Sequence, residues 1–221
     1  MNLFKKIVSA ALLCMAILAV ATSCGLRDGE VSEDDFVTNV KLDTDLSSYT
    51  QTVLDTKDGS VKSKYIVKLD NDTLYRIEYD ADGNVVYELY IQKNDATYVQ
   101  YRNEYKNGKA GFWKIGRVQR EVWVANRQFL YGIDDRYGLE ELLKYDDFTF
   151  DAENAEYVCN ELPVMYDGVY FTDVKLRFEG GKMSYLEMLQ VYGKGKAKLE
   201  QTFVYGEGEL LIPEDVLNAP R

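Results

Sequence analysis

The sequence contains no histidine. Ser-His-Asp and Cys-His catalytic groups need an imidazole as the base, and the usual zinc sites need it as a ligand, so these classes are excluded. The paired acids Asp134-Asp135, Glu140-Glu141 and Asp146-Asp147 lie near a short expected helix and a loop, where solvated carboxylates are normal. No catalytic constellation is visible, so we expect a protein that is not an enzyme and uses no cofactor.

Cysteine is scarce, with three residues in 221. Cys14 lies in an apolar N-terminal stretch, Cys24 follows that stretch, and only Cys159 lies well inside the chain. A framework of disulfides is therefore excluded, and stability has to come from packing. Without a histidine to act as a base, Cys159 is expected to be a buried, unreactive core residue.

Positive charge is also in short supply. The 26 Lys and Arg residues face 37 Asp and Glu residues, which gives a formal net charge of −11. Nucleic acid binding and electrostatic adhesion to anionic lipid both need clustered basic side chains, so we expect no nucleic acid partner. The length fits one domain with a hydrophobic core, or at most two small ones.

The first 23 residues have the three regions of a secretory signal peptide. Lys5 and Lys6 supply the positive charge, Ile7 to Ala21 is almost wholly apolar, and small residues follow. A membrane-spanning helix needs about 17 to 25 apolar residues, so this stretch is too short to span. We expect it to be cleaved.

The segment from Leu18 to Gly25, with the sequence LAVATSCG, resembles the bacterial lipobox. In that motif small residues precede a cysteine whose sulfur takes a diacylglycerol, although a Leu is more usual where this chain has Ala21. The resemblance implies that Cys24 is the lipid-attachment residue of a protein anchored on the extracytoplasmic side of the cell membrane or outer membrane. Ala19-Val20-Ala21 is also an A-x-A site for ordinary signal peptidase, which would release a soluble protein.

Residues 24–35 are polar and rich in acids, without apolar periodicity, and are expected to form a flexible acidic tether. The remaining residues, 36–221, are expected to form one β-rich domain. The stretch Val31–Leu54, which covers the end of the tether and the start of this domain, alternates more like a strand than a helix. From about Val61 the side chains alternate with a period of two between turn signals such as Asp82-Gly83, which indicates an antiparallel meander.

The pattern changes in two places after the meander. Val118, Val122 and Val124 indicate short strand-like pieces, and Leu139, Leu142 and Leu143 then follow the i, i+3, i+4 spacing of a short amphipathic helix. The last strands are expected to end with Leu210–Ile212, because Pro213 has no N–H to donate. The fold class is therefore mainly β (α+β), with an antiparallel, strongly curved meander sheet or half-barrel and a short helical insert.

The succession of hairpins, a central helical insert and a return to long strands resembles the LolA/LppX type of lipoprotein carrier. The ending Thr202–Pro213, a strand, a glycine turn, a second strand and a proline, is similar to theirs. The resemblance covers about Val61 to Glu214 and implies a half-open sheet whose concave apolar face, covered by helices, holds acyl chains. Val31–Leu54 departs from it, because the family usually has a helix there.

By this resemblance the protein binds or carries a lipid or another hydrophobic ligand. The residues expected to line its cavity are Tyr87, Leu89, Ile91, Leu139, Leu142, Leu143, Tyr185 and Leu189. The alternative is that these side chains only contact one another in a dry core. No metal site is expected, because the calcium-loop-like Asp80–Asn84 lies between strands and puts Leu89 where a glutamate ligand is needed.

A second hypothesis comes from the 18 tyrosines. Tyr79–Asn84 and Tyr105–Ala110 loosely resemble units of hairpin-repeat proteins such as MORN or YwqK-like modules. Under this reading the domain is a surface interaction module that binds a protein or glycan through a Tyr-rich face.

Overall fold

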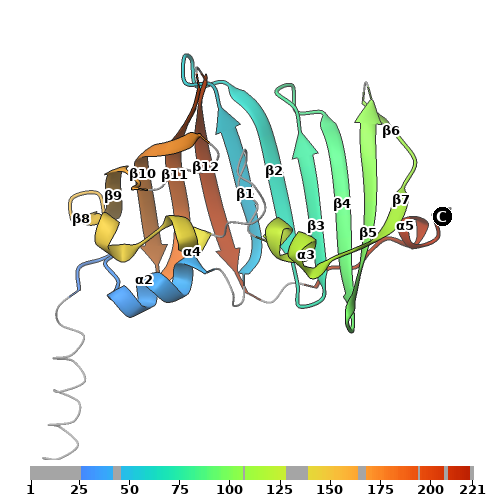
Figure 1. Cartoon of the computed structure of the whole chain (residues 1–221), viewed down its shortest axis with the longest axis horizontal. Coiled ribbons are helices and arrows are strands. Elements are labelled where there is room, and N and C mark those ends of the chain that lie inside the picture. Colours follow the sequence, from blue (N-terminus) through green and yellow to red (C-terminus); the bar gives the residue numbers. More distant parts are fainter. Residues whose placement is uncertain are drawn as a thin grey trace, which may run out of the picture.

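The structure is a computed structural model. It describes residues 26–41, 46–106, 108–127, 139–163, 168–193, 195–206 and 209–219. The expected signal peptide, Cys24, Asp134 and Asp135 lie outside the described residues. The described residues form one open, curved, antiparallel sheet of twelve strands (Figure 1), which confirms the predicted fold class.

Two meanders build the sheet. The first comprises β1 (Leu46–Leu54), β2 (Val61–Leu69), β3 (Thr73–Tyr79), β4 (Val85–Asn94), β5 (Thr97–Lys106), β6 (Lys109–Ala110) and β7 (Lys114–Val118). The second comprises β8 (Thr149–Asp151), β9 (Glu156–Glu161), β10 (Val169–Glu179), β11 (Lys182–Tyr192) and β12 (Gly195–Tyr205). Antiparallel pairing of β1 with β12 joins them in the middle of the sheet.

Local turn chemistry explains the hairpins. Gly83 adopts φ +79° between β3 and β4, and the Asp80 carboxylate accepts hydrogen bonds from the N–H groups of Asp82 and Asn84 at 3.0 and 2.8 Å. This is the hairpin turn expected from Asp82-Gly83. Tyr79–Asn84 is thus the β3–β4 connection within one continuous sheet.

One face of the sheet, called here the helix-covered face, carries three short helices (Figure 1). They are α2 (Glu33–Val40), α3 (Arg120–Arg127) and α4 (Leu139–Leu142). Helix α2 contacts β11 and α4, whereas α3 contacts β3 and β5. The helices therefore form two groups, one over each meander. A short 3₁₀ turn, η1 (Tyr145–Asp147), follows α4 and contacts α2.

Helix α2 corrects two expectations, because it begins inside the expected tether and replaces the first part of the strand-like pattern, whereas the last part, Leu46–Leu54, is strand β1. Ser32 caps it by accepting a hydrogen bond from the Asp35 N–H at 3.2 Å, and three acids in the first turn suit the helix dipole. Just before it, the N–H of Val31 donates to the Tyr157 hydroxyl at 3.0 Å, and that hydroxyl donates to the Val31 carbonyl at 2.8 Å. The packed domain thus begins at about Val31.

Helix α3 corrects a third expectation, because Val122 and Val124 lie in a helix and only Val118 lies in a strand, β7. Trp123 is buried against the sheet while Val124 is exposed, so the valine spacing coincided with a strand period by chance. The predicted helix at Leu139–Leu143 is confirmed as α4, and Leu139 and Leu142 within it and Leu143 just after it are all buried.

The C-terminal segment is the fourth correction, because Leu210–Ile212 forms no strand. β12 is already paired on both sides, with β1 and β11, so no free edge remains beside it. Pro213 instead precedes α5 (Glu214–Leu217). Val216 packs against Tyr90 and Tyr101 on the face opposite the helices. That face is therefore covered over the first meander by the end of the chain.

Phe36 tests whether α2 belongs to the folded core. Its ring is fully buried, with four aromatic ring centroids at 5.4–5.5 Å. We expect Phe36→Ala to lower the free energy of unfolding by about 3 to 5 kcal/mol, as for other buried aromatic truncations. Val37→Ala is the control, because the neighbouring Val37 is 42% exposed, and it should change stability by about 0.5 kcal/mol or less. If urea denaturation gives the same loss of unfolding free energy for both variants, α2 is not packed against the core.

Candidate functional site

Six of the eight predicted ligand-contacting residues lie on the helix-covered face, three of them on β4 of the first meander and three at α4, which packs with α2 over the second meander. Leu89 and Ile91 of β4 belong to one buried apolar cluster with Leu139 and Leu142 of α4 and the adjacent Leu143, and the half-buried Tyr87 packs against it. These six side chains therefore share one face of the sheet, as expected. They contact the core directly, so a ligand among them requires the helices to move away from the sheet.

Tyr185 and Leu189 lie on the opposite face. Strand register shows this, because Tyr185 pairs with Thr202 and lies in the same cross-strand row as Ile66, Ile77 and Glu88. Glu88 and Leu89 are neighbours on β4, so their side chains point to opposite faces. Met188 and Leu186 occupy the helix-covered face of β11 instead. The two residues therefore do not belong with the α4 leucines.

A row of polar and aromatic side chains crosses the middle of the helix-covered face. It consists of Gln201, Gln51, Tyr65, Glu78 and Tyr87, and each is the cross-strand partner of the next. We call it the polar row. Gln51 and Gln201 are buried, and the residues two positions away on the same face of each strand are buried hydrophobic residues. An apolar surface with a few fixed polar groups is the usual composition of a site for a small organic ligand.

Arg76 lies beside the polar row and links it to α3. Its Nη1 donates to Oδ1 of Asn126 at 2.9 Å, and its Nη2 forms an ion pair with Glu78. The rings of Tyr65 and Tyr87 lie 5.7 and 5.8 Å from the guanidinium carbon. Cation–π contacts of this kind strengthen as water is excluded, and only 15% of the Arg76 side chain is exposed.

The backbone of α3 is held from the same side. The Tyr49 hydroxyl of β1 donates to the Asn126 carbonyl at 3.1 Å, and Nδ2 of Asn126 donates back to the Val122 carbonyl at 2.7 Å. Polar contacts therefore fix the C-terminal end of α3, while Trp123 packs its middle. Burial raises the pKa of the Tyr87 phenol, so this ring stays neutral beside Arg76 at physiological pH.

Sequence reasoning missed Arg76 and Asn126. On β3, Leu74, Arg76 and Glu78 face the helices, and alternation alone does not show which face of a strand belongs to the core. Tyr75 instead packs against Tyr90 on the opposite face, with ring centroids 4.6 Å apart. One feature could have indicated them, because Arg76 pairs with the predicted Leu89 and Glu78 pairs with the predicted Tyr87 across the β3–β4 hairpin.

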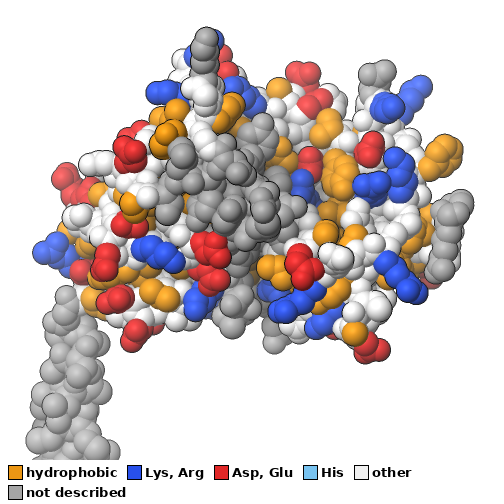
Figure 2. All heavy atoms as spheres, viewed as in Figure 1, with side chains coloured by type: hydrophobic (Ala, Val, Ile, Leu, Met, Phe, Trp, Pro, Cys, Tyr) orange, Lys and Arg blue, Asp and Glu red, His pale blue; other side chains and the backbone are white. Residues whose placement is uncertain are grey.

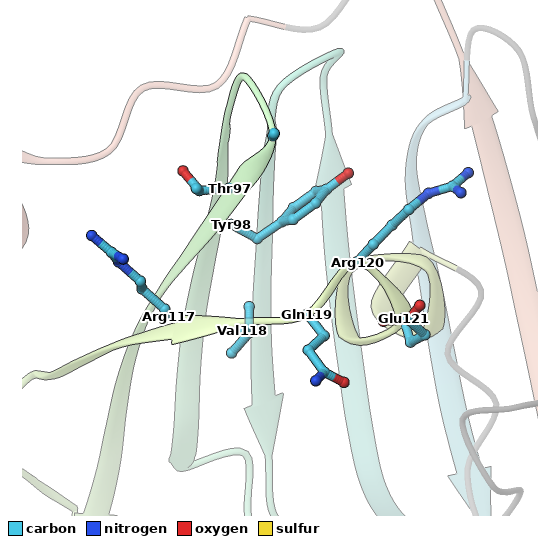
Figure 3. A pocket seen from close by; sticks show the side chains of 8 residues that line it. Thr97, Tyr98, Arg117, Val118, Gln119, Arg120 and Glu121 are labelled. Carbon is cyan, nitrogen blue, oxygen red and sulfur yellow. The ribbon is translucent and has the colours of Figure 1, made fainter.

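Three pockets are lined by residues that the structure describes, and none of these three includes Tyr87, Leu89 or Ile91. The largest of the three, about 520 Å³, lies between β5, β7 and the start of α3 (Figure 3). A second, about 390 Å³, includes Leu189 and Lys198 on the opposite face. A third, about 370 Å³, lies between α2 and α4 and includes Leu143.

Charge does not mark a single site over the helices, because acidic and basic side chains alternate across this view (Figure 2). Within the described ranges, no three Cys, Asp or Glu side chains are grouped so that they could hold a metal ion. None of the described helices has the length and apolar character needed to span a membrane. Cys159 is buried, as predicted, and burial raises the pKa of its thiol.

Comparison with known proteins adds no assignment. No family model matches this sequence, and no curated protein matches it. Function is therefore inferred from the geometry of the described residues.

Arg76 offers a test of how α3 is attached. We expect Arg76→Gln to lower the free energy of unfolding by about 1.5 to 3 kcal/mol, because it removes a hydrogen bond from a charged donor and leaves Glu78 unpaired. Hydrogen exchange of the α3 amides should also accelerate. Arg102→Gln is the matched control. Arg102 lies on β5 opposite Leu89, which is also the cross-strand partner of Arg76, and its side chain is exposed. If both variants exchange alike at α3, Arg76 does not hold the helix.

Proposed function

We propose that this protein is a lipid-anchored extracytoplasmic carrier that binds a lipid or another hydrophobic ligand between the helix-covered face and its helices. One observation carries the proposal. The open sheet has an apolar face crossed by the polar row, and short helices in two separate groups cover that face. Such a surface suits an amphiphile, because hydrocarbon contacts the apolar side chains while amides and Arg76 meet polar atoms.

The helices are suited to act as a removable cover. α2 and α3 have eight residues each and α4 has four, and isolated helices this short are unstable in water. Their structure therefore depends on packing against the sheet. A ligand whose hydrocarbon covers the apolar face in place of the helices compensates for the free energy that is lost when the helices unpack.

The resemblance to LolA/LppX carriers supports the same proposal. Its one departure was the missing helix before the first strand, and α2 now occupies that position. The central insert also contains helices, α3 and α4, between the two meanders. Carriers of that type hold acyl chains under their helices, and no catalytic step is proposed for this chain.

Neighbouring residues of β2 provide the sharpest test. Val67 is fully buried on the helix-covered face, whereas the half-buried Ile66 points to the opposite face. In a delipidated sample, we expect Val67→Phe to weaken binding of a dansyl-labelled fatty acid about tenfold, because the larger ring takes ligand space. Ile66→Phe should bind as the wild type does.

Folding is controlled by circular dichroism and thermal unfolding of both variants. If Val67→Phe fails to fold, Val53→Leu on the same face of β1 repeats the test with one added methylene. Equal affinity of all the folded variants would contradict a ligand site on this face. Absence of wild-type binding would contradict the proposed function itself.

The membrane anchor is a separate part of the proposal and rests on Cys24 in the lipobox-like segment. A diacylglycerol on its sulfur would hold the domain beside a bilayer without a spanning helix. We expect the wild-type protein to enter the detergent phase of a cloud-point separation and Cys24→Ser to stay in the aqueous phase. Aqueous partition of both proteins would show that the chain is cleaved by ordinary signal peptidase.

A further inference from the structure

The largest of the three pockets combines positive charge with an apolar floor. It is lined by Ala96, Thr97, Tyr98, Arg117, Val118, Gln119, Arg120 and Glu121. Its volume of about 520 Å³ is in the usual range for small-molecule sites, roughly 300 to 1,000 Å³. The β4–β5 turn, the end of β7 and the first turn of α3 meet around it (Figure 3).

Two arginines flank this pocket. Arg117 ends on one side of Tyr98 and Arg120 on the other in Figure 3, and both side chains are exposed. Neither guanidinium takes part in an ion pair among the described residues, although the chain as a whole carries a net charge of −11. Guanidinium groups bind phosphate and carboxylate oxygens through paired N–H donors. Glu121 is the acidic residue of the lining, so the pocket keeps a net positive charge.

The floor of the pocket leads into the hydrophobic core. Tyr98 and Val118 are half-buried and pack against the main apolar cluster. The Tyr98 ring lies 5.8 Å from the ring of Trp123, a residue of α3 that is buried against the sheet. Strand register places Arg117, the partner of Val99, on the opposite face, whereas Tyr98 and Val118 face the helices, so the two arginines reach the pocket from the two faces of the sheet. A molecule with a charged head and an apolar tail would therefore meet one arginine from each face at this end of the sheet, with the aromatic rings behind them on the helix-covered face. The N-terminus of α3 adds partial positive charge at the same end.

We propose that this pocket binds the anionic headgroup, phosphate or carboxylate, of the amphiphile whose hydrocarbon chain lies under α3. This inference rests on the proposed carrier function and specifies the class of ligand. Entry at the edge of the sheet lets the headgroup stay hydrated while the chain follows Tyr98 and Trp123 inward. The carrier thereby distinguishes anionic from zwitterionic lipids.

Calorimetric titration of the delipidated mature protein tests this assignment. The probes are dioctanoylphosphatidylglycerol, dioctanoylphosphatidylcholine and inorganic phosphate, with the lipids kept below their micellar concentrations. We expect the anionic lipid to bind more tightly than the zwitterionic one. Arg117→Gln/Arg120→Gln should weaken only the anionic lipid, by about tenfold or more, as expected for lost charged hydrogen bonds.

The control is Lys64→Gln/Lys68→Gln, which removes the same charge from exposed positions of β2 on the opposite face. It should leave both affinities unchanged. Equal binding of the two lipids by the wild type, or an unchanged affinity in the arginine variant, would overturn the headgroup site and leave the carrier function standing. Inorganic phosphate binding as tightly as the anionic lipid would mean a free-anion site and would also overturn it. If neither lipid binds, the carrier function fails together with this inference.

Discussion

The pairing of β1 with β12 is the contact on which the architecture depends. Strands from the two ends of the domain meet in the middle of the sheet, where Tyr49 faces Phe203 and Gln51 faces Gln201. Closing so long a loop costs chain entropy, which the pairing recovers only with the two meanders already formed on either side. Because of it, one continuous face extends from β4 to β10, and the helices of both meanders cover that single surface.

The two faces of this sheet have different roles. On the opposite face the Glu88 carboxylate accepts hydrogen bonds from Tyr75 and Tyr105 at 2.8 and 2.5 Å, and the C-terminal segment packs on the tyrosines. That face is fixed by interlocking polar and aromatic contacts. The helix-covered face instead holds its cover through short helices and the Arg76–Asn126 contact. The helix-covered face is the one on which the ligand site is proposed.

Local signals in the sequence predicted local structure well. Turn residues such as Asp82-Gly83 marked the hairpins because a glycine with positive φ is a requirement of the turn itself. The spacing of the leucines predicted α4, because apolar residues at i, i+3 and i+4 lie on one side of a helix. Short elements with one or two core contacts gave weaker patterns. Only Phe36 and Val40 are buried on α2, and the valines of α3 coincided with a strand period.

Pairing between distant strands was beyond the reach of these patterns. Tyr185 and Leu189 are apolar and alternate correctly, but which face they occupy depends on the registers that connect β11 through β12 and β1 to β4. A shift of one residue exchanges the two faces, and no local property fixes it. Arg76 became visible as a site residue only with its partners from β2, β4 and α3 in place.

Native mass spectrometry of the gently purified mature protein tests the central claim most directly. The account predicts an added mass of a lipid or similar amphiphile that is lost on denaturation, while any acyl groups on Cys24 persist because they are covalent. A protein that carries no removable ligand in repeated preparations from its own membranes would contradict it.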